Sequence, residues 1–198
     1  MTAVVLASQS PSRAAILAAA GVGFETVASD VDEDAEKAAL LARGATAREV
    51  AARLAESKAL RVSSRRPHAL VIGADQTLEL DGALHDKAAS LDEARRRLQA
   101  LRGRRHALHA AVAIARGGTL IWAMMESPSL LMRDFSDGFL DAYLAQEGEA
   151  LLGSVGCYRL ESRGAQLFEA VDGDYFAILG LPLVPLLGLL RREGALAA

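Results

Sequence analysis

The sequence lacks several features that whole classes of proteins require. A single cysteine, Cys157, excludes an intramolecular disulfide framework and a zinc site built from several cysteines, and it is typical of a reducing compartment. The formal net charge of −3 provides no broad basic face for a nucleic acid. The richest apolar stretch, residues 178–190, is short and interrupted by Pro182 and Pro185, and the N-terminus has no basic region followed by a long apolar segment. We therefore expect a cytoplasmic protein that binds neither nucleic acid nor membranes.

The chain has enough hydrophobic residues to form a large core. It contains 198 residues, of which 52% are hydrophobic and 24% are charged. Strand and helix signals alternate closely, with no Gly/Ser linker, low-complexity tract or internal repeat between them. The sequence therefore predicts one α/β domain over residues 1–198. Residues 106–115, 119–125 and 130–135 are typical of an antiparallel meander, so the predicted sheet is mixed.

Apolar runs and helix-capping patterns place the other predicted elements. Besides the meander, strands are predicted at residues 4–7, 24–28, 69–74, 78–80 and 166–171. Helices are predicted from Pro11, from Thr46 to about Ser63, and over residues 91–101, 137–146 and 183–192. The segment 29–34, with its four carboxylates, is interpreted as an acidic loop after the second strand.

The segment VVLASQSPSR, residues 4–13, combines a short buried strand, a serine-rich turn and a helix start. Pro11 suits the first helical position, so unpaired backbone N–H groups would lie beside the hydroxyls of Ser8, Ser10 and Ser12. The Arg13 guanidinium adds positive charge, and together these donors suit a phosphate. An ordinary capped helix has the same layout, so both interpretations stay open from this segment alone.

Two carboxylates are candidates for metal binding or catalysis. Asp75 follows the apolar run of residues 70–74, and ligands of open α/β sheets bind beyond the carboxyl ends of strands. Glu33 belongs to the acidic segment, and with Asp75 it would provide the oxygen ligands that Mg²⁺ or Mn²⁺ prefers. The alternatives are a turn or helix-cap aspartate at position 75 and a solvated carboxylate at position 33.

Lysine is rare in this chain, because arginine supplies most of the positive charge. The lysines are Lys37, Lys58 and Lys87. Lys58 falls on one line with Val50 and Leu54, four residues apart on a predicted helix, so it extends an apolar stripe. A compact ammonium suits a phosphate oxygen. The alternatives are a snorkelling side chain for Lys58 and a surface loop lysine for Lys87.

The histidines and the cysteine give no sign of covalent catalysis or of a metal site. Cys157 has no histidine nearby in sequence, and the four histidines show no recurrent metal-ligand spacing. The surroundings of His106 and His109 are typical of a strand, in which the two side chains point to opposite faces.

In this order, the segments LASQSPSR, SDVDE, GADQ, the Lys87 loop and GLPL resemble the Maf family of nucleotide pyrophosphatases over nearly the whole chain. The resemblance implies an elongated, ITPase-like α/β fold, in which a mixed twisted sheet is flanked by helices and two lobes surround a nucleotide cleft. It also implies hydrolysis of a nucleoside triphosphate between the α and β phosphates with Mg²⁺ or Mn²⁺, as house-cleaning of the nucleotide pool. A homodimer is a further expectation. The alternative function is a nucleotide-binding regulator of cell division, a septum formation inhibitor with little turnover.

The resemblance also implies roles for individual residues. Those matched to triphosphate binding are Ser8, Arg13, Lys58 and Lys87. Asp75 matches the catalytic aspartate and Glu33 the carboxylate of the acidic loop, and both are expected to hold the metal and take part in catalysis.

Three positions differ among branches of the family and are expected to determine the base. Gln76 and Glu161 make this chain more similar to the branch associated with 7-methyl-GTP than to the branch associated with dTTP and UTP. A carboxylate can accept two hydrogen bonds from the N1–H and N2–H edge of guanine, and it favours the positive charge of a 7-methylated purine. Ser12 and Ala88 depart from that branch, so the base stays open.

Overall fold

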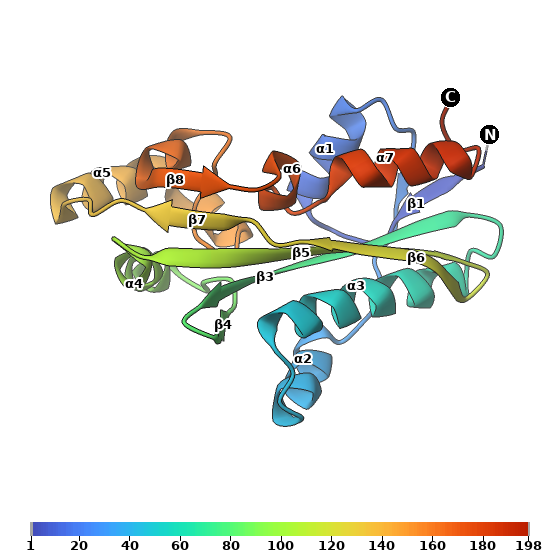
Figure 1. Ribbon diagram of the computed structural model, residues 1–198, viewed down its shortest axis with the longest axis horizontal. Helices are drawn as coiled ribbons and strands as arrows, with labels where there is room; N and C mark the ends of the chain where they lie inside the picture. Colours follow the sequence, from blue (N-terminus) through green and yellow to red (C-terminus); the bar gives the residue numbers. More distant parts are fainter. Residues whose placement is uncertain (1, 198) are drawn as a thin grey trace.

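Two long antiparallel strands, β3 (Leu70–Leu80) and β5 (Arg105–Arg116), run along the computed structural model, which describes residues 2–197 (Figure 1). The sheet order is β2-β1-β3-β5-β7-β8, with β4 paired to β3 and β6 paired to β5. Strand β1 is parallel to β2 and β3 and the other pairs are antiparallel, so the predicted mixed sheet is confirmed. The shorter strands are β1 (Val4–Leu6), β2 (Glu25–Thr26), β4 (Ala83–His85), β6 (Thr119–Glu126), β7 (Ser129–Met132) and β8 (Phe168–Asp172).

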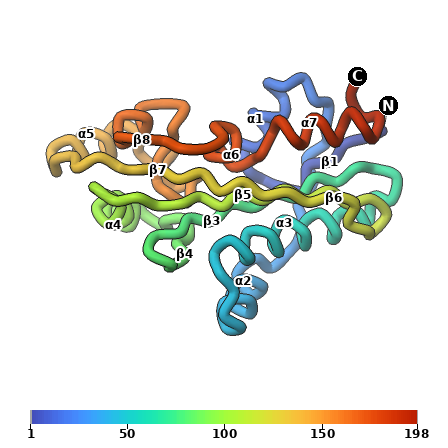
Figure 2. Tube along the Cα trace, viewed as in Figure 1, coloured from blue at the N-terminus to red at the C-terminus, as the bar shows by residue number. Residues whose placement is uncertain are grey.

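Helices cover both faces of this sheet, because successive side chains of a strand alternate between the faces. Helix α3 (Ala47–Ser63) packs on one face, where small side chains such as Ala55 and Ala113 permit a close approach. Helices α1 (Pro11–Ala19) and α7 (Leu183–Arg192) cover the opposite face, against residues such as Ile114 (Figures 1 and 2). Within residues 2–197, no helix is both long and apolar enough to cross a bilayer.

The two predicted lobes each have a large hydrophobic core of their own. The first core joins α1, α7 and the beginning of β3, including Leu70 and Ile72. The second joins the end of β3, including Leu78, to α4 (Leu91–Leu101) and α5 (Asp137–Glu147). The strands β3 and β5 pass through both lobes, so one sheet fixes the lobes relative to each other (Figure 1).

Several local predictions are confirmed at the level of single hydrogen bonds. Helix α1 begins at Pro11, and the Ser10 hydroxyl caps it by accepting from the Arg13 amide. The capping box of Thr46 and Glu49 starts α3 as predicted. Helix α5 and helix α7 lie where the sequence placed them. These features depend on neighbours in the chain, which explains why sequence patterns find them.

The acidic loop was a wrong prediction, because the second half of that segment starts a helix. Helix α2 (Glu33–Ala42) is capped by Asp32, and its first turn contains Glu33, Asp34 and Glu36. Carboxylates at this end of a helix are stabilised by its free N–H groups and its dipole. The carboxylates of Asp32, Glu33 and Asp34, which were predicted to lie in a loop, therefore lie at the N-terminus of a helix. The short helix α6 (Tyr175–Ile178) was also not predicted.

The predicted strand end before Asp75 was wrong as well, because β3 continues through this residue to Leu80. On one side β3 pairs with β5 along residues 71–79. On the other side it pairs with β1 along residues 70–72 and with β4 along residues 78–80. Residues 73–77 therefore lie in a gap between β1 and β4, and Asp75 lies at its centre. Because β1 ends at Leu6, the sheet opens there although β3 itself does not end.

Candidate active site

A cleft of about 1190 Å³ lies over this gap in the sheet. Its walls come from the start of α1, from α2 and α3, from the Lys87 loop, from residues 150–161 and from residues 178–180. All the site residues expected from the sequence line it: Ser8, Ser12, Arg13, Glu33, Lys58, Asp75, Gln76, Lys87 and Glu161. The fold thus gathers into one cavity residues that are far apart in the chain.

A lysine between two carboxylates forms the floor of the cleft. The Lys58 ammonium lies 2.7 Å from Asp75 Oδ1 and 2.7 Å from Glu33 Oε2. Lys58 is only 4% exposed and Asp75 is also buried, whereas Glu33 is partly exposed at the start of α2. The contact with Asp75 is a charge-assisted hydrogen bond, which is short and oriented, and the contact with Glu33 is an ion pair. The ammonium therefore orients Asp75 and holds Glu33 beside it.

Gly73 permits the contact between Lys58 and Asp75, and the sequence-based reasoning did not single this glycine out. It faces α3 from β3, two residues before Asp75 and on the same side of the strand. A Cβ atom at this position would lie 2.1 Å from the Ala55 carbonyl oxygen and 2.5 Å from the Ala59 amide nitrogen. Helix and strand can therefore approach closely only with glycine here. A glycine within an apolar strand run was the available signal.

Arg13 forms the second cationic group of the cleft. Its Nη1 donates to Ser8 Oγ at 3.2 Å, and its Nε donates to the Gly180 carbonyl oxygen at 2.9 Å. The Ser8 hydroxyl also accepts from the Ser10 amide, so it fixes both the turn and the guanidinium. Burial lowers the pKa of Arg13, while the charges of Asp75 and Glu33 oppose that shift. Arginine is effectively always protonated in proteins, so this side chain stays cationic.

Lys87 supplies a third positive charge from the loop between β4 and α4. Its pKa is lowered, first by partial desolvation in the cleft and then by the charges of Arg13 and Lys58. Glu33 and Asp75 act in the opposite direction. The three cations thus repel one another across the cleft, and a bound polyanion would relieve that repulsion.

Two of the expected specificity residues make hydrogen bonds to the α6 region. Gln76 Nε2 donates to the carbonyl oxygens of Ala177 and Ile178, at 2.9 and 3.0 Å. The Ser12 hydroxyl donates to the Leu179 carbonyl oxygen at 2.9 Å. Both side chains therefore fix the end of α6 and the turn that carries Gly180.

The third expected specificity residue, Glu161, lies on the opposite wall. Its Oε1 accepts from Arg159 Nε at 3.2 Å. Arg159 also lines the cleft, and the sequence-based reasoning missed it. This wall therefore offers both a donor and an acceptor to a planar polar ligand.

The same wall contains a tight turn, residues 154–158. The Ser154 hydroxyl donates to the Tyr158 carbonyl oxygen at 2.9 Å and accepts from the Tyr158 amide at 3.1 Å. Gly156 lies against the Tyr158 ring, where a Cβ atom would come within 2.2 Å of a ring carbon. Cys157, which is buried, adopts a φ of 56° in this turn. A few short-range contacts thus set the shape of the wall.

A buried histidine supports this turn from behind. Burial raises the pKa of Tyr158, so its hydroxyl keeps its proton, and this hydroxyl shares a hydrogen bond of 2.8 Å with His106 Nε2. Burial also lowers the pKa of His106 to about 4. His109 lies on the other face of β5, where it contacts Ser127 and Glu79, so the predicted opposite orientation of the two histidines is confirmed.

Glu33 and Asp75 fit a divalent cation that arrives together with phosphate groups. Within residues 2–197, no group of three or more His, Cys, Asp or Glu side chains forms a metal site by itself. Lys58 contacts one oxygen of each carboxylate. Mg²⁺ is commonly bound through one or two carboxylates together with substrate phosphates, so these two residues match that donor set.

Comparisons with known proteins find relatives over almost the whole chain. The family model described as Maf-like protein matches residues 3–193. A nucleoside triphosphate pyrophosphatase of Caulobacter vibrioides is 61% identical, over 99% of this chain and 98% of its own. A 7-methyl-GTP pyrophosphatase of Brucella abortus is 48% identical, over 96% of each chain. Among solved structures, a HAM1 protein from Coxiella burnetii aligns with a TM-score of 0.45 and 17% identity, covering 68% of this chain and 75% of that one.

Proposed function

Because this chain belongs to the Maf-like protein family, we propose that it is a nucleoside triphosphate pyrophosphatase. It hydrolyses the bond between the α and β phosphates and releases a nucleoside monophosphate and pyrophosphate. The observation that carries the proposal is the Lys58 ammonium between Asp75 and Glu33, on the floor of a cleft that Arg13 and Lys87 also line. Relatives that bear this activity in their names match almost the whole chain.

Asp75 is the group proposed to act on the attacking water. Its carboxylate is buried on the cleft floor, and the hydrogen bond from Lys58 fixes its orientation. A carboxylate held in this way can orient a water molecule and accept its proton during in-line attack on the α-phosphorus. Glu33, on the other side of Lys58, completes the pair of carboxylates.

Arg13, Lys58 and Lys87 are proposed to bind the triphosphate. As the bond to the bridging oxygen breaks, negative charge develops on the leaving pyrophosphate, and fixed cations stabilise it without reorganising. Glu33 and Asp75 would hold Mg²⁺ or Mn²⁺. Such an ion supplies Lewis-acid polarisation of the phosphoryl oxygens and lowers the pKa of bound water.

The wall of residues 150–161 is proposed to bind the base, with 7-methyl-GTP as the preferred substrate. Glu161 offers two carboxylate oxygens, which match the N1–H and N2–H donors of guanine. Arg159, beside it, offers a donor for the O6 acceptor. Relatives named 7-methyl-GTP pyrophosphatase at 45–48% identity support this choice. The physiological role proposed from it is removal of modified nucleotides in the cytoplasm.

A pyrophosphate-release screen tests the function directly. The purified chain is incubated with ordinary and modified nucleoside triphosphates in the presence of Mg²⁺ or Mn²⁺. We expect release of pyrophosphate, fastest with 7-methyl-GTP. Release of inorganic phosphate instead would overturn the proposed bond cleavage. Tight binding without any release would favour the regulatory alternative.

A further inference from the structure

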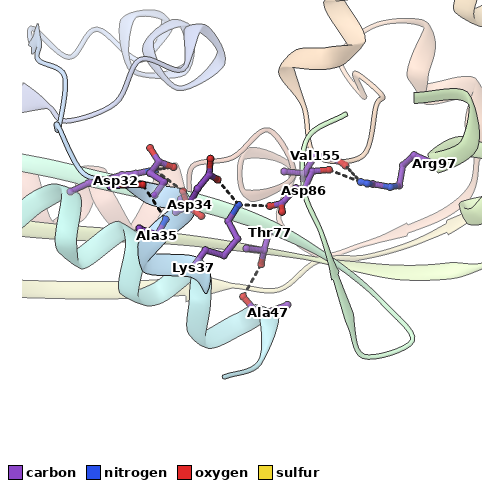
Figure 3. A network of polar contacts seen from close by, with 12 residues as sticks. Asp32, Asp34, Ala35, Lys37, Ala47, Thr77, Asp86, Arg97 and Val155 are labelled. Carbon is purple, nitrogen blue, oxygen red and sulfur yellow. Dashed lines mark hydrogen bonds and ion pairs between the residues drawn. The ribbon is translucent and has the colours of Figure 1, made fainter. Parts of the chain in front are cut away.

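A chain of polar contacts ties the Lys87 loop to both sides of the cleft, and no expected site residue takes part in it. Asp86, directly before Lys87, is its central residue. Its Oδ1 accepts from the Lys37 ammonium of α2 at 2.7 Å, and Lys37 also contacts Asp34 at 3.3 Å. Figure 3 shows the Lys37 ammonium between these two carboxylates.

Arg97, on α4 in the second lobe, holds the same loop from the other side. Its Nη1 donates to the Asp86 carbonyl oxygen at 2.7 Å and to the Val155 carbonyl oxygen at 2.8 Å (Figure 3). Val155 belongs to the turn of residues 154–158 in the wall proposed to bind the base. The chain Lys37–Asp86–Arg97–Val155 therefore joins α2 to α4 and to the wall of residues 150–161 beside the cleft, and we call it the strap.

The strap is connected to the cleft floor through α2. Glu33 and Lys37 are one helical turn apart, so they lie on the same face of this helix. Glu33 contacts Lys58 on the floor, and Lys37 contacts Asp86 in the loop. Helix α2 thus links a carboxylate of the floor to the loop that carries Lys87.

The charges around Lys87 indicate a role for the strap. Arg13 and Lys58 repel Lys87. Glu33 and Asp75 attract it, so the balance of these charges depends on where the loop holds the Lys87 ammonium. The ion pair of Lys37 with Asp86 restrains that loop. Burial lowers the pKa of Lys37, but the contacts with Asp86 and Asp34 outweigh that effect and raise it, so Lys37 stays charged.

We infer that Lys37 is a positioning residue that acts through Asp86 to hold Lys87 at the triphosphate. The inference rests on the proposed function, because it assigns Lys37 a role in binding the same substrate. The side chain of Lys37 is mostly buried and contacts the carboxylates of Asp34 and Asp86, and the Asp86 contact ties it to the loop that carries Lys87. All the lysines of the chain, including this one, line the cleft.

The test is a set of variants combined with Lys87. Lys37→Met and Asp86→Asn are each expected to raise KM for the triphosphate about tenfold while kcat falls less, which is a normal size for coupling within one charged network. The double variant should resemble either single variant. In a Lys87→Ala background, Lys37→Met should have no further effect, because the group that it positions is gone. Lys37→Arg should retain most of the affinity.

Two controls separate a failed inference from a failed function. Arg53→Met removes an exposed ion pair with Glu56 on α3, outside the cleft, and should leave KM unchanged. The second control is the affinity for a non-hydrolysable α,β-methylene triphosphate, measured by calorimetry. This affinity shows the effect of the strap on binding even where turnover is absent. The inference is overturned by an unchanged KM and affinity in Lys37→Met, or by an equal loss in the Lys87→Ala background. A wild-type chain without pyrophosphate release overturns the proposed function instead. If Lys37→Met fails to fold, KM and affinity of Asp86→Asn, alone and combined with Lys87→Ala, test the inference in its place.

Discussion

The two walls of the cleft are stabilised by different interactions. The floor and the triphosphate side depend on charged groups that come from distant parts of the chain, such as Lys58 between Asp75 and Glu33. The wall of residues 150–161 depends on hydrogen bonds within one short turn and on the neutral contact between Tyr158 and His106. A network of charges fixes several elements at once, whereas the hydrogen bonds of the turn act mainly within the turn, which Arg97 joins to the Lys87 loop. This difference suits the proposed roles of the two walls, which are chemistry common to all substrates on one side and recognition of the base on the other.

Asp75→Asn should produce the largest effect, because it removes the proposed base from the charged side. Pyrophosphate release should fall about 10³-fold while nucleotide binding stays measurable, in line with the usual contribution of a positioned acid–base group. The matched control is Glu79→Gln, the same kind of change on the same strand, outside the cleft lining. Turnover at the wild-type rate in Asp75→Asn would remove this residue from the chemistry.

Lys58→Met tests whether the ion pairs on the cleft floor also stabilise the folded protein. The substitution leaves the buried carboxylate of Asp75 without its cation, and breaking a buried ion pair in this way costs about 3 kcal/mol. The free energy of unfolding, measured by urea denaturation at neutral pH, should fall by about that amount. Arg53→Met, which removes an exposed ion pair, should change it by less than about 1 kcal/mol. Equal effects of the two substitutions would show that the buried ion pair on the cleft floor stabilises the fold no more than an exposed one.

The wall of residues 150–161 should respond to pH through His106. Burial lowers the pKa of His106 from 6.5 to about 4, so between these pH values the unfolded chain binds a proton that the folded chain does not. The stability due to neutral His106 is present above pH 6.5 and is lost as the pH falls toward 4, by at most about 3 kcal/mol. Thermal unfolding of wild type and His106→Gln should diverge across this window, with the wild type more sensitive to acid. Parallel curves would exclude His106 as the titrating group.

Glu161→Gln should have the smallest effect and should act on selectivity alone. A glutamine keeps one acceptor oxygen but presents an NH₂ group where the second carboxylate oxygen stood, so one hydrogen bond to guanine is lost. The ratio of kcat/KM for 7-methyl-GTP to that for UTP should fall about tenfold, which corresponds to about 1.4 kcal/mol. An unchanged ranking of substrates would remove Glu161 from recognition of the base.

Local features of this protein could be predicted from the sequence, and contacts between distant segments could not. Pro11, the capping box of Thr46 and Glu49, and the position of Lys58 on its apolar stripe all depend on neighbours within a few residues. Strand β7 pairs with β5 rather than with β6, so the predicted meander order was wrong. Two further wrong predictions concern acidic positions. Glu33 starts a helix rather than lying in a loop, and Asp75 lies within a strand rather than at its end. Both errors arose because local charge was interpreted without knowing the neighbouring strands and helices.

The sequence by itself determined the α/β class, the helix starts and the set of polar residues expected at the site. Only the tertiary structure decided how those residues meet. The early end of β1 opens a gap beside Asp75, and Gly73 lets α3 approach closely enough for Lys58 to reach it. The contacts of Lys37 with Asp86 and of Arg97 with Val155 arise in the same way. Such pairings are set by long-range packing of helices and strands, and no periodicity along the chain encodes them.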